Sequence, residues 1–112
     1  MLYTINMAES LEFYSLILGF RVESYDEHLG WACIVKDTIR IMFSLPNEQR
    51  PFDRPVFTGS FYFYPDNVEL LWHKVKDQVQ IAYPLEKFDY GMHEFGIYDN
   101  NGYLLQFGKP LV

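Results

Sequence analysis

The chain contains two copies of one local pattern about half a chain apart, and this repeat constrains the fold more than any other feature. In each copy an Asx residue ends a β-rich run, a Glu follows three positions later, and an amphipathic stretch begins: Asn6-Met7-Ala8-Glu9 and Asp66-Asn67-Val68-Glu69. An Asx side chain at a helix N-cap accepts from a first-turn amide, while the Glu can reach back to the cap. With Asn6 and Asp66 as caps, the repeat predicts internal two-fold pseudo-symmetry.

Each amphipathic stretch has helical spacing. The first places four apolar residues on one face, and Gly19 follows as a stop signal: Met7, Leu11, Tyr14 and Leu18. The second repeats the spacing in a helix that we expect to reach about Val79: Val68, Leu71, Trp72 and Val75. Half a chain is too short for an independent core, so each half should need the other half, or a second chain, to bury its apolar face.

Composition narrows the class of protein. At 112 residues and 49% apolar content, the chain should form one domain with a substantial core. A net charge of −6 argues against binding to nucleic acid or an anionic membrane, because both need a basic surface. Neither a membrane-spanning run nor a signal peptide is recognisable, and the single Cys33 cannot form an internal disulfide. We therefore expect a cytoplasmic protein.

The strands can be placed coarsely from β-rich runs and turn signals. In the first half they are expected at Leu2–Ile5, Phe20–Tyr25, Trp31–Val35 and Ile39–Phe43. In the second half they are expected at Phe57–Tyr64, Ile81–Tyr83, His93–Tyr98 and Tyr103–Phe107, the last two joined by a turn in which Asn101-Gly102 supplies positive φ angles. Residues 45–55 contain three prolines and should be a loop that joins modules 1–45 and 56–112 of the single domain 1–112.

Two short signatures carry a family resemblance. Glu12-Phe13-Tyr14 leading to Leu18-Gly19-Phe20, and Glu94-Phe95 leading to Asp99-Asn100-Asn101-Gly102-Tyr103, resemble those of the glyoxalase, bleomycin-resistance and dioxygenase superfamily, also called the vicinal oxygen chelate fold. The resemblance covers essentially the whole chain. It implies an α+β fold of two βαβββ modules that curl into an incomplete barrel around a cleft, and a homodimer of two such chains.

Metal-using members of that superfamily place His, Glu or Gln ligands on the first, fourth, fifth and eighth strands. Carried onto this chain, the first position would precede Met1, the fourth-strand position falls on Met42 or Arg40, and the fifth-strand position falls on Ser60. Gln106 at the eighth-strand position is the one residue able to bind a metal. A catalytic divalent ion usually needs three protein ligands, so we expect no metal and no other cofactor.

Strand alternation gives a candidate cleft wall that does not depend on the resemblance. A two-residue turn at Lys36-Asp37 would pair Cys33 with Arg40 and Trp31 with Met42, and would turn their shared face toward the cleft. The second half should present Ser60, Tyr62, Tyr64 and Gln106, together with Glu94 and Tyr98 from the seventh strand. The predicted ligand-binding residues are Trp31, Cys33, Arg40, Met42, Ser60, Tyr62, Tyr64, Glu94, Tyr98 and Gln106.

This wall is aromatic and contains few acid-base groups, so it favours binding over catalysis and gives no catalytic residue. It predicts a metal-free small-molecule binding protein of the bleomycin-resistance type, an antibiotic-binding protein by resemblance, that sequesters a flat aromatic ligand, neutral or cationic. The alternative is a metal-dependent enzyme of the glyoxalase or dioxygenase type that uses Gln106. Weaker alternatives are a zinc site among the dispersed His28, His73 and His93, a Cys33 nucleophile, and Glu94 with Arg40 as a general base and an electrophile that act on a carbonyl substrate.

Overall fold

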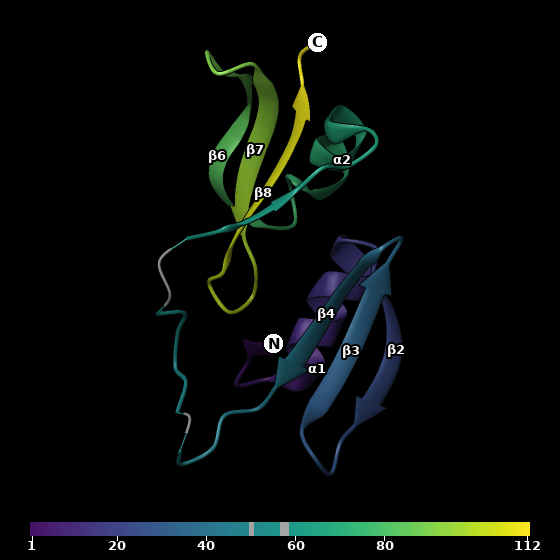
Figure 1. The fold of residues 1–112 in the computed structure, drawn as a ribbon, viewed down its shortest axis with the longest axis vertical. Coiled ribbons are helices and arrows are strands. Elements are labelled where there is room, and N and C mark those ends of the chain that lie inside the picture. Colours follow the sequence, from purple (N-terminus) through teal and green to yellow (C-terminus); the bar gives the residue numbers. More distant parts are fainter. Residues whose placement is uncertain (50, 57–58) are drawn as a thin grey trace. The chain divides into compact units, whose positions relative to one another are not determined.

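The computed structural model describes residues 1–49, 51–56 and 59–112 and divides into two compact units, residues 1–56 and 57–112. Each unit runs strand, helix, strand, strand, strand, and each builds one four-stranded sheet (Figure 1). The internal pseudo-symmetry predicted from the repeat, and the α+β class with two βαβββ modules implied by the family resemblance, are therefore confirmed. Within the described residues, no helix combines the length and apolarity needed to cross a membrane.

The first unit contains β1 Leu2–Tyr3, α1 Met7–Glu12, the π-helix η1 Phe13–Ile17, β2 Arg21–Asp26, β3 Trp31–Lys36 and β4 Ile39–Ser44. Its sheet has the order β1-β4-β3-β2, with β1 parallel to β4 and the other pairs antiparallel. The second unit contains β5 Phe61–Phe63, α2 Val68–Val75, β6 Gln80–Lys87, β7 Met92–Tyr98 and β8 Leu104–Pro110. Its sheet order, β5-β8-β7-β6, repeats the first.

Both helices begin at an asparagine cap. The Asn6 side chain accepts from the Glu9 amide and the Asn67 side chain from the Leu70 amide, each at 3.0 Å. The second cap is therefore Asn67 and not the predicted Asp66. In the first copy the cap amide donates to the Thr4 hydroxyl at 3.2 Å, so this hydroxyl takes the place that a back-reaching Glu9 was expected to fill.

The predicted helical faces form the two cores. Met7, Leu11, Tyr14 and Leu18 are all buried, and the Tyr14 ring meets the Phe43 ring of β4 edge-on, with centroids 5.0 Å apart. In the second unit a row of rings from Phe63 through Phe107 and Phe95 to Trp72 joins β5, β8, β7 and α2 at centroid separations of 5.1–5.2 Å. The odd-numbered residues of β7 and β8 therefore face the helix, as alternation predicted.

Two turns differ from the predictions. In the first hairpin Lys36 pairs with Ile39 and Cys33 with Met42, so the turn is Asp37-Thr38, with φ of 54° at Asp37. The turn lies one residue later than predicted, so the partner of each residue on the facing strand shifts by two positions. A shift of two changes every predicted pair but keeps each side chain on its predicted face of the sheet. In the last hairpin φ is positive at Gly102 but not at Asn101, and the Asp99 side chain closes the turn by accepting from the amides of residues 101, 102 and 103.

Three element lengths also differ from the predictions. Helix α2 ends at Val75 and not near Val79, because residues 76–78 form a turn before β6. Strand β6 is eight residues long although it contains Pro84, which it tolerates as an edge strand with irregular pairing beyond Tyr83. Strand β5 covers only Phe61–Phe63, so Ser60 precedes it, and the predicted positions 57–58 lie outside the described residues.

The cap of α2 gives a first prediction. Replacing Asn67→Ala should lower the free energy of unfolding by about 1 kcal/mol, because the Leu70 amide loses its acceptor. Chemical denaturation monitored by circular dichroism measures the change. Asn67→Asp is the matched control and should retain most of the stability, since aspartate caps as well as asparagine. Equal losses in both variants would contradict the capping role.

Candidate functional site

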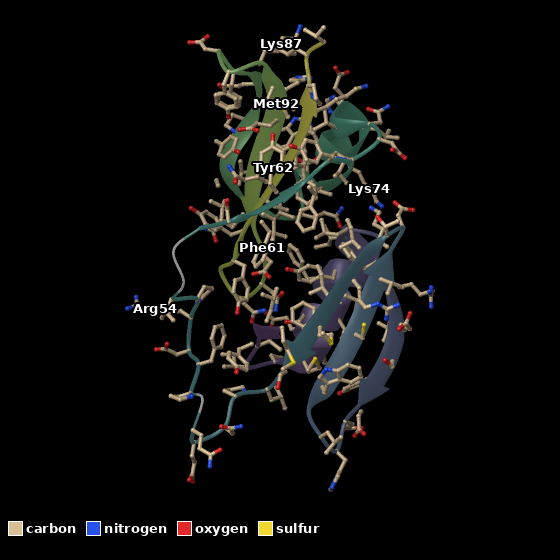
Figure 2. All side chains as sticks on the ribbon, in the orientation of Figure 1. Arg54, Phe61, Tyr62, Lys74, Lys87 and Met92 are labelled. Atoms are coloured by element: carbon tan, nitrogen blue, oxygen red, sulfur yellow. The ribbon has the colours of Figure 1, made fainter. Side chains whose placement is uncertain are left out.

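A pocket of about 340 Å³ lies in the second unit. Six side chains from β5, β7, β8 and the segments beside them line it: Tyr62, Tyr64, Tyr90, Met92, Glu94 and Gln106. Tyr62 and Met92 come from the strands on either side of β8 (Figure 2). Four of the six were predicted from strand alternation.

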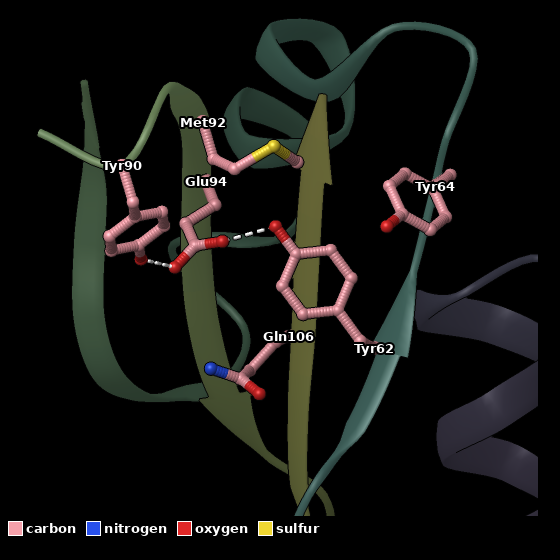
Figure 3. Close-up of a pocket in the computed structure, with 6 residues that line it drawn as sticks. All are labelled: Tyr62, Tyr64, Tyr90, Met92, Glu94 and Gln106. Atoms are coloured by element: carbon pink, nitrogen blue, oxygen red, sulfur yellow. Dashed lines mark hydrogen bonds between the residues drawn. The ribbon is translucent and has the colours of Figure 1, made fainter. Parts of the chain in front are cut away.

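Glu94 is the centre of this pocket. Its side chain is only 2% exposed, and three tyrosine hydroxyls donate to its carboxylate. Tyr62 donates to Oε2, while Tyr90 and Tyr83 both donate to Oε1, the latter at 3.2 Å. Figure 3 shows the Tyr62 and Tyr90 hydroxyls reaching Glu94 from opposite sides. A buried carboxylate is costly unless it is hydrogen-bonded, and this one is bonded at both oxygens.

The register of the sheet explains how distant tyrosines meet at Glu94. Tyr62 of β5 pairs with Gln106 of β8, Gln106 with Gly96 of β7, and Gly96 with Tyr83 of β6. The two tyrosines therefore stand at the two edges of one row across the sheet, with Gln106 and Gly96 between them. The Gln106 amide bridges the row, because its Nε2 donates to the Tyr83 hydroxyl at 2.9 Å.

Two glycines let the tyrosine rings lie over the sheet. A Cβ on Gly108 would stand 2.8 Å from Tyr62 Cζ and 3.0 Å from Glu94 Cβ, and a Cβ on Gly96 would stand 2.9 Å from Tyr83 Cδ1. All three distances are shorter than an ordinary contact between carbon atoms. Each ring therefore occupies the space that a side chain on the glycine would fill, and its hydroxyl reaches Glu94 as a result.

The surroundings keep the phenols protonated. The pKa of Tyr62 and that of Tyr83 are raised first by burial, and the hydrogen bond to Glu94 raises both further. The hydrogen bond to Glu94 is the main cause that raises the pKa of Tyr90 to about 12. At neutral pH the three tyrosines are therefore neutral hydrogen-bond donors to one carboxylate.

The sequence-predicted residues divide between the units. Ser60 lies beside the pocket and donates to Gln106 Oε1, whereas Tyr98 is not among the lining residues. In the first unit, Arg40 donates to Glu23 and to the buried Cys33 thiol, the latter at 3.5 Å. The hydrogen bond between Arg40 and Glu23 is the main cause that lowers the pKa of Glu23 and raises that of Arg40.

The remaining predicted residues of the first unit lie on the same strands. Met42 is 40% exposed and pairs with Cys33, and Trp31 is half-buried and pairs with Ser44. The two members of the Glu94–Arg40 pair that the sequence suggested have other partners: Arg40 bonds to Glu23, and Glu94 bonds to three tyrosines.

Three residues of the site were missed. Met92 shares the parity of Glu94 and could have been found by extending the predicted strand one residue toward the N-terminus, from His93 to Met92. Tyr90 follows the end of β6 and precedes Gly91, whose φ of 87° turns the chain, so strand alternation does not reach it. Tyr83 pairs with Gly96 next to register shifts in β6, which no sequence pattern indicated.

The side chains around Gln106 do not form a suitable set of ligands for a catalytic divalent cation. Its hydrogen-bond partners are the hydroxyls of Ser60 and Tyr83, both neutral. Among the described residues that line the pocket, the one carboxylate is that of Glu94, which accepts three phenol hydrogen bonds. Catalytic sites usually hold such ions with three His, carboxylate or thiolate ligands. In the parts of the chain that the structure describes, no three His, Cys, Asp or Glu side chains group in this way.

Comparison with known proteins decides the family. The model of the Glyoxalase/Bleomycin resistance protein/Dioxygenase superfamily matches residues 1–107. The chain belongs to this superfamily. A search of curated proteins finds no match. The predicted resemblance is thus confirmed for the superfamily as a whole.

Several solved structures have the same fold. TioX from Micromonospora sp. ML1 is 15% identical, with a TM-score of 0.80 over 98% of this chain and 94% of that chain. A glyoxalase/bleomycin resistance protein/dioxygenase from Nocardioides is 13% identical, with a TM-score of 0.77 over 98% and 80%. Lactoylglutathione lyase from Agrobacterium tumefaciens is 17% identical, with a TM-score of 0.74 over 96% and 87%. At these identities the likeness establishes the fold alone.

The glycine beneath Tyr62 gives a second prediction. Gly108→Ala should lower the free energy of unfolding by about 1–3 kcal/mol, because the new methyl group overlaps the Tyr62 ring and presses on Glu94. Denaturant unfolding of a double-mutant cycle with Tyr62→Ala measures the coupling. In the Tyr62→Ala background the alanine should cost much less, whereas a cost unchanged by the loss of the ring would show that the two residues are independent.

The phenol cluster gives a third prediction, on pH. A group whose pKa is higher in the folded state stabilises the fold below its unfolded pKa, and the contribution is lost as pH rises to the folded value. The free energy of unfolding should therefore fall between about pH 10 and about pH 12, the ordinary pKa of tyrosine and that of Tyr90. Denaturant unfolding across this range measures it. Tyr90→Phe should flatten the fall, and Tyr25→Phe, outside the pocket, should not.

Proposed function

We propose that this superfamily member is a small-molecule binding protein that holds a flat aromatic ligand, with preference for a cation, in the second-unit pocket, and that it works without a metal. The supporting observation is a buried carboxylate, that of Glu94, in a pocket otherwise formed largely by tyrosine rings. Aromatic faces attract both flat rings and cations. A carboxylate behind those faces adds a fixed negative charge, which a cationic ligand would neutralise.

The exposure of the rings supports this role. Tyr64 and Tyr90 are 72% and 64% exposed, so their ring faces remain available for contact although Tyr90 is anchored to Glu94. The Tyr90 ring is also stacked on Phe88, with centroids 5.3 Å apart and planes at 9°, which holds its orientation. Rigid rings bind at low entropic cost, because few rotamers need to be fixed when the ligand arrives.

Sequestration without turnover fits the chemistry of the wall. The Glu94 carboxylate already accepts three phenol hydrogen bonds, and the raised pKa values of these phenols make them poor proton donors near neutral pH. The cytoplasmic location, the antibiotic as ligand and the pairing of two chains into a homodimer stay predictions. The first-unit residues Trp31, Cys33, Arg40 and Met42 stay proposed ligand contacts.

Binding gives a fourth prediction. Flat polycyclic cations, antibiotics of this class included, should raise the free energy of unfolding by about 2.7 kcal/mol at 100 times their dissociation constant. Thermal-shift titration against neutral analogues with the same ring system measures the effect. Glu94→Gln should reduce the preference for the cation, and the matched control Glu27→Gln, at an exposed turn of the first unit, should not.

Two outcomes would contradict the proposal. If no ring compound, cationic or neutral, changed the thermal stability of the protein, the proposed ligand class would be wrong. Stoichiometric nickel, zinc, manganese or iron in protein purified without chelators, with an activity lost on chelation, would favour the alternative, a metal-dependent glyoxalase or dioxygenase that uses Gln106.

A further inference from the structure

The direction of each hydrogen bond around Glu94 determines what the pocket offers a ligand. A phenol has one hydroxyl hydrogen, and Tyr62, Tyr83 and Tyr90 each donate theirs to the Glu94 carboxylate. An ionised carboxylate is an acceptor only, so these bonds cannot run the other way. The lone pairs of the phenol oxygens are what remains for other partners, and at Tyr83 one of them already accepts from Gln106.

The rest of the lining adds few donors near this carboxylate. The Gln106 amide accepts from Ser60 and gives one of its two Nε2 hydrogens to Tyr83, which leaves one hydrogen. Met92 offers only a thioether, a weak acceptor. The remaining hydroxyl, that of Tyr64, is on a side chain that is 72% exposed and stands apart from Glu94, on the far side of Tyr62 (Figure 3).

The wall around Glu94 is therefore acceptor-rich as well as negative. Hydrogen bonds that donate into a carboxylate polarise the donor, so the oxygens of Tyr62 and Tyr90 are stronger acceptors than those of isolated phenols. Both face a pocket that Glu94 lines from behind (Figure 3). A ligand would satisfy this wall by presenting N–H groups that carry positive charge.

We propose that the pocket selects a flat ring that bears an N–H cation, such as an amidinium, a guanidinium or a protonated amine, over the same ring with a quaternary ammonium, a neutral amide or a carboxylate. The inference rests on the proposed function and names its ligand class. A quaternary ammonium would satisfy the ring faces but would leave the phenol oxygens without donors. A carboxylate would be repelled by Glu94, and a neutral amide would lack the charge.

The ring series 2-naphthamidine, 2-naphthamide, trimethyl(2-naphthyl)ammonium and 2-naphthoate tests this selection by isothermal titration calorimetry on the full chain. The amidine should bind at least about tenfold more tightly than the other three, the least that a charge-assisted hydrogen bond contributes. Tyr62→Phe and Tyr90→Phe each remove one phenol acceptor and should weaken amidine binding more than quaternary ammonium binding. Tyr25→Phe, in the first unit, is the matched control and should change neither.

Loss of folding is separated from loss of binding by unfolding curves for every variant. Equal affinity for the amidine and the quaternary ammonium would overturn the N–H selection but leave the proposed ring-binding function in place. No binding by any of the four would overturn both. Unchanged amidine affinity in Tyr62→Phe and Tyr90→Phe would show that the phenol oxygens are not the acceptors, and would overturn the inference even if the amidine binds best.

Discussion

The second-unit site depends on one interaction, the hydrogen bonding of the Glu94 carboxylate by tyrosine hydroxyls. Removing a carboxylate from water is expensive, and donors at both oxygens offset that cost. Because the donors come from β5, β6 and the segment after β6, the carboxylate also connects elements far apart in the chain. Burial first, and then the hydrogen bond to Glu94, raises the pKa of Tyr62, and the hydrogen bond to Glu94 is the main cause that raises the pKa of Tyr90. The phenols therefore stay neutral beside the carboxylate.

This arrangement requires bare backbone beneath the rings. Gly96 and Gly108 lie on the two central strands, where a larger residue would usually contribute to packing, and here each provides space for a tyrosine that crosses the sheet. The opposite face of the same strands is filled by Phe95 and Phe107, which pack toward α2. One face of the sheet therefore provides stability through stacked rings, and the other has the glycines that allow a polar pocket.

The fold was predictable because its signals are local and periodic. Helix caps and alternation identified both modules, and even the two-residue error in the first hairpin left Cys33 and Met42 on the correct face, since side chains alternate with a period of two. The site was only partly predictable. Glu94 followed from alternation, but Tyr83 and Tyr90 reach it through irregular pairing and a positive-φ glycine, features that depend on tertiary packing.

The two units share a backbone plan but not a chemistry. On the first sheet the charged pair is Arg40 with Glu23, whose side chains are 56% and 36% exposed. An exposed pair gains little from its attraction, because water solvates both partners about as well when they separate. On the second sheet the Glu94 carboxylate is buried and accepts hydrogen bonds from three neutral tyrosine hydroxyls. It cannot move without losing these bonds. A duplicated fold can thus confine a preorganised charge to one copy, because the repeat fixes strand order while single glycines and tyrosines decide what the strands enclose.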